Sequence, residues 1–359
     1  MKEIAIVPFG NVFFKNKIFD IENQNLNRDN SLVPFYYLKR KLKKNEISIN
    51  TIDMYDNIAD LDAVLFLTLD FKLINKCIKN GLENKMVYIA LEPPVVIKEH
   101  SPEGLKKLGD LFKYIMTWQD DLIDNKKFFK INFPQYFGEQ RVEKMKFNNK
   151  KLLTNISGNK TSDYPDELYS ERLEVIKYFE NKHSNEFDFY GIGWDNSKDN
   201  YKNYLGKVNR KIDAYQKYKF ALCFENMKNI NGYITEKIYD CFKAQIVPIY
   251  WGASNIERYV PKDCFIDYRE FNDVDELYKY ISSIDKSSYK KYINNINNFL
   301  NSDNIKPFGT QCFYQSIYNM LKVIETNKDD FKIHIFSILR LKKELYLRIL
   351  KRKVSLLWR

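Results

Sequence analysis

The sequence predicts an α/β fold built from two doubly wound domains. Short apolar runs, which are typical of buried parallel strands, alternate along the chain with segments of helical periodicity. A length of 359 residues is long for one domain and ordinary for two. A polar, charged stretch at residues 138–150 separates two such alternating units. We therefore expect one domain at residues 1–145, a second at 146–328 and a tail at 329–359.

The first unit contains four apolar runs that we predict to be strands, with helical patterns between them. The run at residues 86–91 is followed directly by Glu92 and two prolines, which fix the backbone beyond the strand. In order, we expect strands at residues 3–7, 62–68, 86–91 and 114–118, and helices at 33–44 and 71–80.

The second unit repeats this alternation. Gly191 and Gly193 follow one of its short apolar runs, and Asp273 stands where it can cap a helix. In order, we expect a strand at 152–157, a helix at 166–181, a strand at 187–190, a series of strand, loop, helix and strand within 218–271, and helices at 273–282, 285–300 and 310–326.

The composition restricts the class of protein. Five scattered cysteines without a CxxC pair are typical of reduced thiols in a cytosolic protein. The sequence has no run of about 20 apolar residues that could span a membrane, and its N-terminal apolar run is too short for a signal peptide. The three histidines are far apart, without metal-ligand spacing. Two Asp-x-Asp pairs, at 60–62 and 273–275, are expected by chance, so we predict no metal site.

The net charge of +11 is concentrated in the tail. Residues 331–359 contain nine Lys or Arg and one Glu, which gives them +8 and leaves +3 for the rest. Ile338, Leu341, Leu345 and Ile349 follow helical spacing on one face. Such a basic amphipathic helix indicates an anionic membrane surface as partner. The alternatives are a solvated charged tail and a tail that packs on the body of the protein. No nucleic-acid motif accompanies the charge, so we expect no nucleic-acid partner.

Residues 218–271 carry the most informative pattern. Polar and charged residues stand at a predicted helix start, next to an apolar strand that ends at Gly252. Ligands of α/β proteins bind where strand ends meet helix starts, and helix N-termini attract phosphate. The ordered series is Tyr218-Lys219-Phe220, Phe224-Glu225-Asn226, Tyr233-Ile234-Thr235-Glu236-Lys237, Val247-Pro248-Ile249-Tyr250-Trp251-Gly252, Asn255-Ile256, Pro261 and Cys264-Phe265-Ile266.

This series closely resembles the signature of the α1,3-fucosyltransferases, glycosyltransferase family 10, with Cys264 where Ser is usual and Gln245 where Gly is common. The resemblance implies a GT-B fold, in which two Rossmann-like domains face a cleft. It also implies an inverting enzyme that transfers L-fucose from GDP-fucose to O3 of N-acetylglucosamine or glucose. The acceptor would be a cell-surface glycan such as lipopolysaccharide O-antigen. We expect the enzyme in the bacterial cytoplasm, on the inner face of the cytoplasmic membrane.

Two alternatives to this function stay open. One is the same machinery with another GDP-linked deoxy sugar, because the signature does not fix the few cleft residues that discriminate donors. The other is a catalytically inactive glycan- or nucleotide-binding homologue. The presence of Glu92 together with the Tyr-x-Thr-Glu-Lys set argues against the inactive protein.

Glu92 is the candidate catalytic residue. A carboxylate at the carboxyl end of a buried strand faces the cleft. The family has a Glu-Ser-Pro type motif here, with Pro93 as the middle residue in this chain. The resemblance implies that Glu92 is the general base, which takes the proton of the acceptor hydroxyl. The alternative is a solvated acid in a rigid turn.

The resemblance also implies a donor site in the second domain. A lysine and an arginine would neutralise the diphosphate, a glutamate would bond to sugar or ribose hydroxyls, and two further polar residues would line the nucleotide. In GT-B enzymes such groups replace a metal, so no cofactor beyond the GDP-fucose substrate is expected. The residues implied are Arg172, Asn226, Tyr233, Glu236 and Lys237.

Each of these donor residues also has a structural interpretation. Taken alone, Thr235-Glu236-Lys237 is a helix-capping sequence. Arg172 could equally lie on a helix surface and pair with Glu174 or a similar neighbour.

Overall fold

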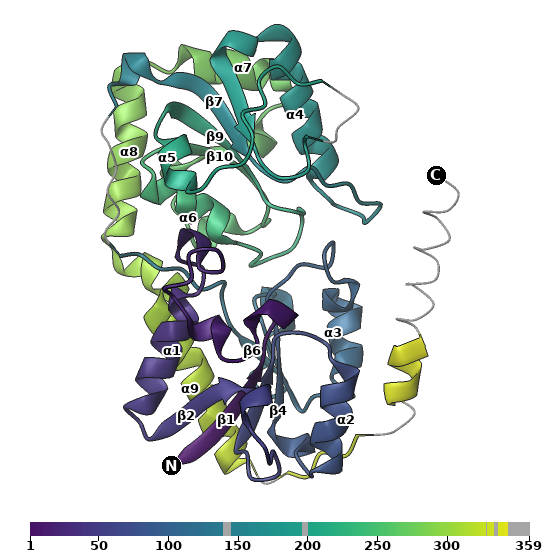
Figure 1. Ribbon diagram of the computed structural model, residues 1–359. Coiled ribbons are helices and arrows are strands. Elements are labelled where there is room, and N and C mark those ends of the chain that lie inside the picture. The colour runs from purple at the N-terminus through teal and green to yellow at the C-terminus, as the bar shows by residue number, and fades with distance from the viewer. Residues whose placement is uncertain (139–144, 196–199, 328, 334–336, 344–359) are drawn as a thin grey trace.

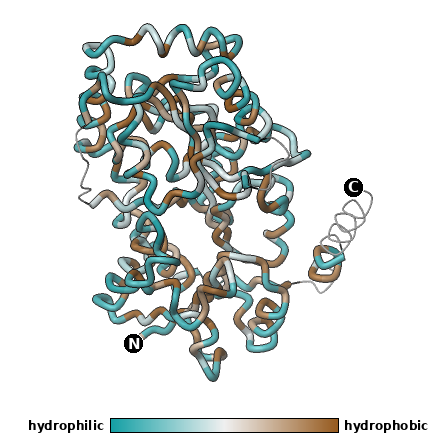
Figure 2. Tube along the Cα trace, turned by 45° about the horizontal axis from the view of Figure 1, so that its top comes forward, coloured by the Kyte–Doolittle hydropathy of each residue, from teal (hydrophilic) through white to brown (hydrophobic). Residues whose placement is uncertain are grey.

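The computed structural model describes residues 1–138, 145–195, 200–327, 329–333 and 337–343. It contains two α/β domains, one above the other in Figure 1, each built on a parallel sheet. Hydrophobic residues follow the strands inside each domain, while the outer turns of the helices are hydrophilic (Figure 2). The predicted two-domain α/β architecture is therefore confirmed.

The first sheet is parallel and covered by helices on both faces. Ile4 and Ile6 pack into the core on one face, and Ala5 and Val7 into the core on the other. In spatial order its strands are β2 (Ile47–Thr51), β1 (Lys2–Val7), β3 (Ala63–Phe66), β4 (Met86–Ala90), β5 (Tyr114–Thr117) and β6 (Phe128–Lys130). Helices α1 (Val33–Lys43) and α9 (Thr310–Thr326) contribute to the first core, and α2 (Phe71–Lys79) and α3 (Pro102–Leu108) to the second.

The sequence did not predict the strands β2 and β6, which form the two edges of this sheet. Strand β2 is buried only at alternate positions, so it shows no continuous apolar run. Strand β6 has only three residues. The short helix α3 was also missed, because its seven residues bury only two leucines.

Helix α9 corrects the predicted domain assignment. The prediction placed residues 310–326 in the second domain because they follow it in sequence. In the structure Phe313, Tyr314, Ile317 and Met320 are buried in the core of the first domain, where α9 lies beside α1 (Figure 1). The chain thus returns to the first domain after completing the second.

The second sheet is also parallel. In spatial order its strands are β11 (Ile266–Asp267), β10 (Val247–Trp251), β9 (Tyr218–Phe224), β7 (Lys151–Ile156) and β8 (Phe187–Tyr190). Helices α4 (Tyr169–Lys182) and α7 (Val274–Ser283) pack into the core on one face, and α5 (Lys211–Tyr215), α6 (Glu236–Lys243) and α8 (Lys286–Leu300) into the core on the other.

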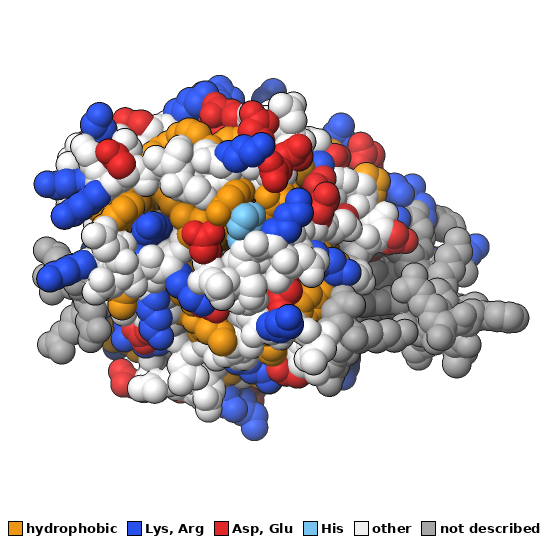
Figure 3. All heavy atoms as spheres, turned by 90° about the horizontal axis from the view of Figure 1, so that it is seen from above, with side chains coloured by type: hydrophobic (Ala, Val, Ile, Leu, Met, Phe, Trp, Pro, Cys, Tyr) orange, Lys and Arg blue, Asp and Glu red, His pale blue; other side chains and the backbone are white. Residues whose placement is uncertain are grey.

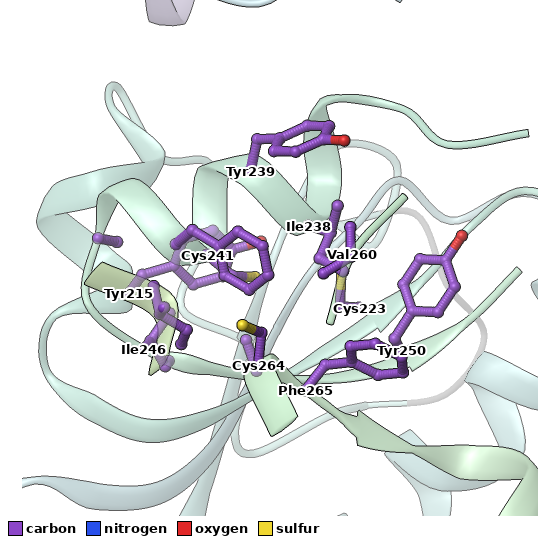
Figure 4. Packing of buried hydrophobic residues seen from close by; sticks show 14 of the residues in the cluster. Tyr215, Cys223, Ile238, Tyr239, Cys241, Ile246, Tyr250, Val260, Cys264 and Phe265 are labelled. Atoms are coloured by element: carbon purple, nitrogen blue, oxygen red, sulfur yellow. The ribbon is translucent and has the colours of Figure 1, made fainter. Parts of the chain in front are cut away.

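Helix α6 is held on this sheet by an apolar face. Ile238 and Cys241 are fully buried on the side of α6 that faces Cys223 of β9 (Figure 4). Tyr239 is also fully buried, on the other side of the helix, where its ring packs against Phe308. This packing fixes the position of the helix start, which carries the Thr-Glu-Lys sequence.

The beginning of the tail packs on the protein. Residues 337–343 are helical, and Ile338 and Leu341 are buried in the second core of the first domain. Arg340 lies 3.4 Å from a carboxylate oxygen of Asp110. These two residues of the predicted apolar stripe therefore face the protein, whereas Leu345 and Ile349 lie outside the described residues.

Within the described ranges, no helix is long and apolar enough to cross a bilayer. On the face seen from above the second domain, acidic and basic side chains are interspersed (Figure 3). That face therefore offers no broad positive patch of the kind that binds a nucleic-acid backbone.

Asp120 joins the two domains. Its Oδ1 accepts hydrogen bonds from Lys130 Nζ (2.6 Å) and from Tyr259 Oη (2.6 Å), and its Oδ2 accepts one from Asn255 Nδ2 (2.7 Å). Burial opposes the charge of Asp120, but these donors outweigh it and hold the pKa of the carboxyl below its usual value. Asn255 Oδ1 in turn accepts from the backbone N–H of Gly232 (2.8 Å).

We predict that Asp120→Ala destabilises the protein by about 1.5–3 kcal/mol, because it removes charge-assisted bonds and leaves Lys130 without its carboxylate. Guanidinium denaturation should show a lower midpoint. Since the pKa of Asp120 is depressed in the folded state, its contribution is present above its unfolded pKa and disappears as pH falls through the folded value.

The control is Asp56→Ala, which changes an exposed aspartate with no bond to any described residue. It should leave the midpoint unchanged. Equal midpoints for Asp120→Ala and wild type would contradict the role of Asp120 as a domain anchor.

Candidate active site

A cavity of about 710 Å³ lies between the two domains. From the first domain, Phe9, Leu67 and Glu92 line it, just beyond the ends of β1, β3 and β4. From the second domain come the loops after β7 and β8 and the start of α6. Both parallel sheets thus present their carboxyl ends to one cavity, which is where α/β proteins bind ligands.

Glu92 follows the carboxyl end of β4, and its carboxylate has no hydrogen-bond partner among the described residues. Its side chain is exposed toward the cavity, which residues of both domains line. Removal from bulk water, and then the negative charge of Glu236, raise the pKa of Glu92, while Lys237 and Lys160 act in the opposite direction. No described residue donates a hydrogen bond to this carboxylate. The group is therefore free to bind a substrate hydroxyl.

The backbone around Glu92 is held by two buried rings. Trp118 Nε1 donates to the carbonyl of Leu91 (2.7 Å), and His100 Nδ1 bonds to the carbonyl of Glu92 (2.6 Å). A carbonyl only accepts, so His100 carries its proton on Nδ1, and Nε2 accepts from Tyr88 Oη (2.7 Å). Burial lowers the pKa of His100 to about 4, so the ring is neutral. His100 is therefore a fixed neutral donor.

Glu225 is a buried carboxylate that binds other residues of the signature region. Its side chain is fully buried, and it accepts hydrogen bonds from the backbone N–H (2.8 Å) and hydroxyl (2.7 Å) of Thr235 and from Lys237 Nζ (3.0 Å). Burial works against the charge of Lys237, but Glu225 and Glu236 outweigh it and raise its pKa. Sequence reasoning placed Glu225 in the signature but gave it no role; its place in Phe-Glu-Asn was the available signal.

Glu236 lines the cavity at the first turn of α6. Burial raises the pKa of this group, but Lys237 and Lys211 outweigh burial and lower it to about 2. Lys211 Nζ lies 3.7 Å from Glu236 Oε1 and 2.7 Å from Asp240 Oδ2. Glu236 is thus ionised and accepts hydrogen bonds, as hydroxyls of a sugar or ribose require. Thr235 also caps α6, so the capping interpretation holds as well.

Arg172 and Tyr233 are buried instead of lining the cavity. Arg172 is 4% exposed, and its Nη2 donates to the carbonyls of Phe224 and Glu225 (2.9 Å each). This burial excludes the interpretation of a surface arginine. Tyr233 packs against Trp118 of the first domain, with ring centroids 4.7 Å apart. Asn226 is half-buried, and its carbonyl accepts from the backbone of Leu168 (3.1 Å).

Of the six predicted site residues, the structure places Glu92 and Glu236 on the cavity wall. Lys237 lies next to Glu236 and is partly exposed. Among the residues that the structure describes, no group of three His, Cys, Asp or Glu is arranged to hold a metal ion.

The second domain and α9 resemble known proteins. Residues 149–325 match the model of the family described as "Glycosyltransferase family 10 (fucosyltransferase) C-term". The α-(1,3)-fucosyltransferase FucT of Helicobacter pylori is 38% identical over 81 residues, which are 22% of this chain and 17% of the relative. The mouse 4-galactosyl-N-acetylglucosaminide 3-α-L-fucosyltransferase 9 is 45% identical over 80 residues, 21% of this chain and 22% of the relative. The aligned segments therefore span about a fifth of these curated relatives.

The whole fold resembles solved structures. A crystal structure of an α1,3-fucosyltransferase aligns with a TM-score of 0.56 at 16% identity, covering 93% of this chain and 92% of the other. Another, with GDP-fucose, gives a TM-score of 0.54 at 18% identity and 92% coverage of both chains. Anabaena HepE in complex with UDP and glucose gives 0.55 at 10% identity, covering 90% of this chain and 100% of the other. The fold is therefore GT-B.

We predict that Glu225→Gln lowers the free energy of unfolding by about 2–3 kcal/mol. Lys237 would lose its buried counter-charge, and the loss should be smaller than for a fully buried pair because Lys237 keeps some contact with water. Urea denaturation measures the change.

Glu171→Gln serves as the control, because it breaks a partly exposed pair with Lys228 and should change stability by less than about 1 kcal/mol. If the two variants unfold at the same urea concentration, Glu225 does not stabilise the signature region.

Proposed function

Since residues 149–325 match the model of glycosyltransferase family 10, we propose that the protein is an inverting α1,3-fucosyltransferase that transfers L-fucose from GDP-fucose to a glycan hydroxyl. One observation carries the proposal. The free carboxylate of Glu92 and the start of the signature helix α6 line the same cavity from opposite domains. An acceptor bound by the first domain and a donor bound by the second meet there.

Glu92 is the proposed general base. Its carboxylate takes the proton of the acceptor hydroxyl as that oxygen bonds to the anomeric carbon of fucose. The bond from this carbon to the diphosphate breaks on the opposite face, and GDP leaves with the electron pair. The raised pKa of Glu92 makes it a stronger base than an ordinary glutamate.

The donor site is proposed around the start of α6. The helix N-terminus and Lys237 supply positive charge for the diphosphate, and the ionised Glu236 accepts bonds from sugar or ribose hydroxyls. Arg172, Asn226 and Tyr233 belong to the same proposal. Arg172 and Tyr233 support the site from their buried positions, and no metal is required for leaving-group stabilisation.

Another GDP-linked deoxy sugar is the second candidate donor. HepE shares the fold at a TM-score of 0.55 and was solved with UDP and glucose, so this fold accommodates different donors. Donor choice depends on side chains of the cavity.

The proposed acceptor is a glycan that the enzyme modifies at the membrane. We expect O3 of N-acetylglucosamine or glucose in a cell-surface glycan such as lipopolysaccharide O-antigen, modified at the cytoplasmic face of the bacterial membrane. An anionic membrane surface stays a prediction for the tail. Arg348, Lys351, Arg352, Lys353 and Arg359, which carry much of its charge, lie outside the described residues.

We predict that Glu92→Gln lowers fucose transfer by roughly 100-fold or more, because it removes the proton acceptor and keeps the shape. The assay measures transfer from GDP-fucose to N-acetyllactosamine and related acceptors. Wild-type activity should fall as pH is lowered through the raised pKa of Glu92, at a higher pH than an ordinary glutamate would give.

GDP affinity is the control, and it should change little in Glu92→Gln because the base belongs to the acceptor side. Wild-type activity should persist in EDTA. Undiminished turnover by the variant would end the assignment of the base, and strict dependence on added Mn²⁺ would overturn the metal-free mechanism.

We predict that His100→Ala lowers kcat by about 10–100-fold, since the carbonyl of Glu92 loses its donor and the carboxylate shifts. His100→Asn should keep most of the activity, because its side-chain amide can donate from nearly the same place as Nδ1. For both variants, kcat is measured per amount of folded protein, and the affinity for GDP is measured as well. Equal kcat values for the two variants would show that the bond does not position Glu92.

A further inference from the structure

Four cationic side chains line the cavity, and three of them have a carboxylate partner. Lys211 Nζ lies 2.7 Å from Asp240 Oδ2, and Lys243 Nζ lies 2.8 Å from Asp240 Oδ1. Arg28, the third, has its Nε 3.6 Å from a carboxylate oxygen of the adjacent Asp29. The positive charge of this part of the wall is therefore largely compensated within the protein.

Lys160 is the exception. It lines the cavity and is exposed, and it makes no hydrogen bond or ion pair with any residue that the structure describes. An ammonium without a carboxylate partner attracts an anion more strongly than one that is already paired with a carboxylate.

The cations expected from the sequence are already engaged. Lys237 Nζ lies 3.0 Å from the buried Glu225, and Arg172 directs Nη2 at two backbone carbonyls. A nucleoside diphosphate brings at least two negative charges into the cavity. The paired Lys237 neutralises them only in part, so the site has a use for a further free cation.

The loop that carries Lys160 is braced against the loop after β8. Asn159 donates from its backbone N–H to the carbonyl of Ile192 (2.9 Å), and Trp194 Nε1 donates to the carbonyl of Ser157 (2.7 Å). Gly191 has φ +148°, and a Cβ there would lie 1.7 Å from the carbonyl oxygen of Ser157, so only glycine allows this contact. The two loops form one wall, which holds the backbone of Lys160 in place.

The charge of Lys160 reaches the reacting side of the cavity. Lys160 and Lys237 both act to lower the pKa of Glu92 from the second domain. The two ammonium groups thus lie close enough to Glu92, the proposed base, to act on its charge.

We propose that Lys160 is a further substrate-binding residue, whose ammonium contacts the diphosphate of the sugar nucleotide and of the departing nucleoside diphosphate. The inference rests on the proposed function and adds a residue to it. As the bond to the anomeric carbon breaks, its electron pair stays on the diphosphate oxygen, whose negative charge grows. Lys160 is not bound to a protein carboxylate, so it can follow this charge and stabilise it.

The test compares Lys160→Ala, Lys160→Gln and Lys160→Arg by calorimetric titration with GDP and with guanosine. Lys160→Ala and Lys160→Gln should weaken GDP binding by about 10–100-fold, the size of one charge-assisted contact, and leave guanosine binding unchanged. Lys160→Arg should recover most of the affinity. The matched control is Lys290→Ala, which removes an exposed lysine on α8 that does not line the cavity.

Wild-type GDP affinity in Lys160→Ala would overturn the proposal, as would equal losses for GDP and guanosine. If wild type transfers no fucose but its GDP affinity depends on Lys160, the fucosyltransferase assignment fails and the phosphate contact stands. If wild type transfers fucose and Lys160→Ala binds GDP normally, the fucosyltransferase assignment stands and the phosphate contact of Lys160 fails. Absence of GDP binding by wild type would overturn both.

Discussion

The buried carboxylate of Glu225 is the constraint on which the signature region depends. A charge without water must be satisfied by the protein, and here Thr235 and Lys237 satisfy it. These bonds tie the end of β9 to the start of α6 and so set where Glu236 meets the cavity. Gly252 follows from the same constraint, because a Cβ there would lie 2.5 Å from Glu225 Cγ. Three separated parts of the signature, which contain Glu225, Thr235 with Lys237, and Gly252, therefore contribute to one interaction.

Trp118 links the domain interface to the catalytic carboxylate proposed here. Its ring packs on Tyr233 of the second domain, and its Nε1 holds the carbonyl of Leu91, beside Glu92. Its own carbonyl accepts from Lys130, which also bonds to Asp120. The contacts that hold the domains together thus also hold the backbone next to Glu92. The position of the proposed base therefore depends on the packing between the two domains.

The strands that are continuously buried were predicted from the sequence, whereas the strands at the edges of the first sheet were not. The strands β4 and β9 are apolar runs, whereas β2 is half-buried at an edge. Glu92 was placed at its strand end by pattern and resemblance. The role of Glu225 and the free charge of Lys160 depend on which side chains meet across long stretches of chain, and local pattern does not contain that information. The side on which α9 packs could not be predicted for the same reason.

The return of α9 to the first domain makes the second domain, in effect, an insertion within the first. During synthesis, β1 to β6 leave the ribosome well before the helix that completes their core. Part of the apolar surface around Phe35 therefore stays uncovered until the entire second domain has been translated. The N-terminal domain is first to be made and last to be finished, so its folding depends on the order of translation as well as on its own residues.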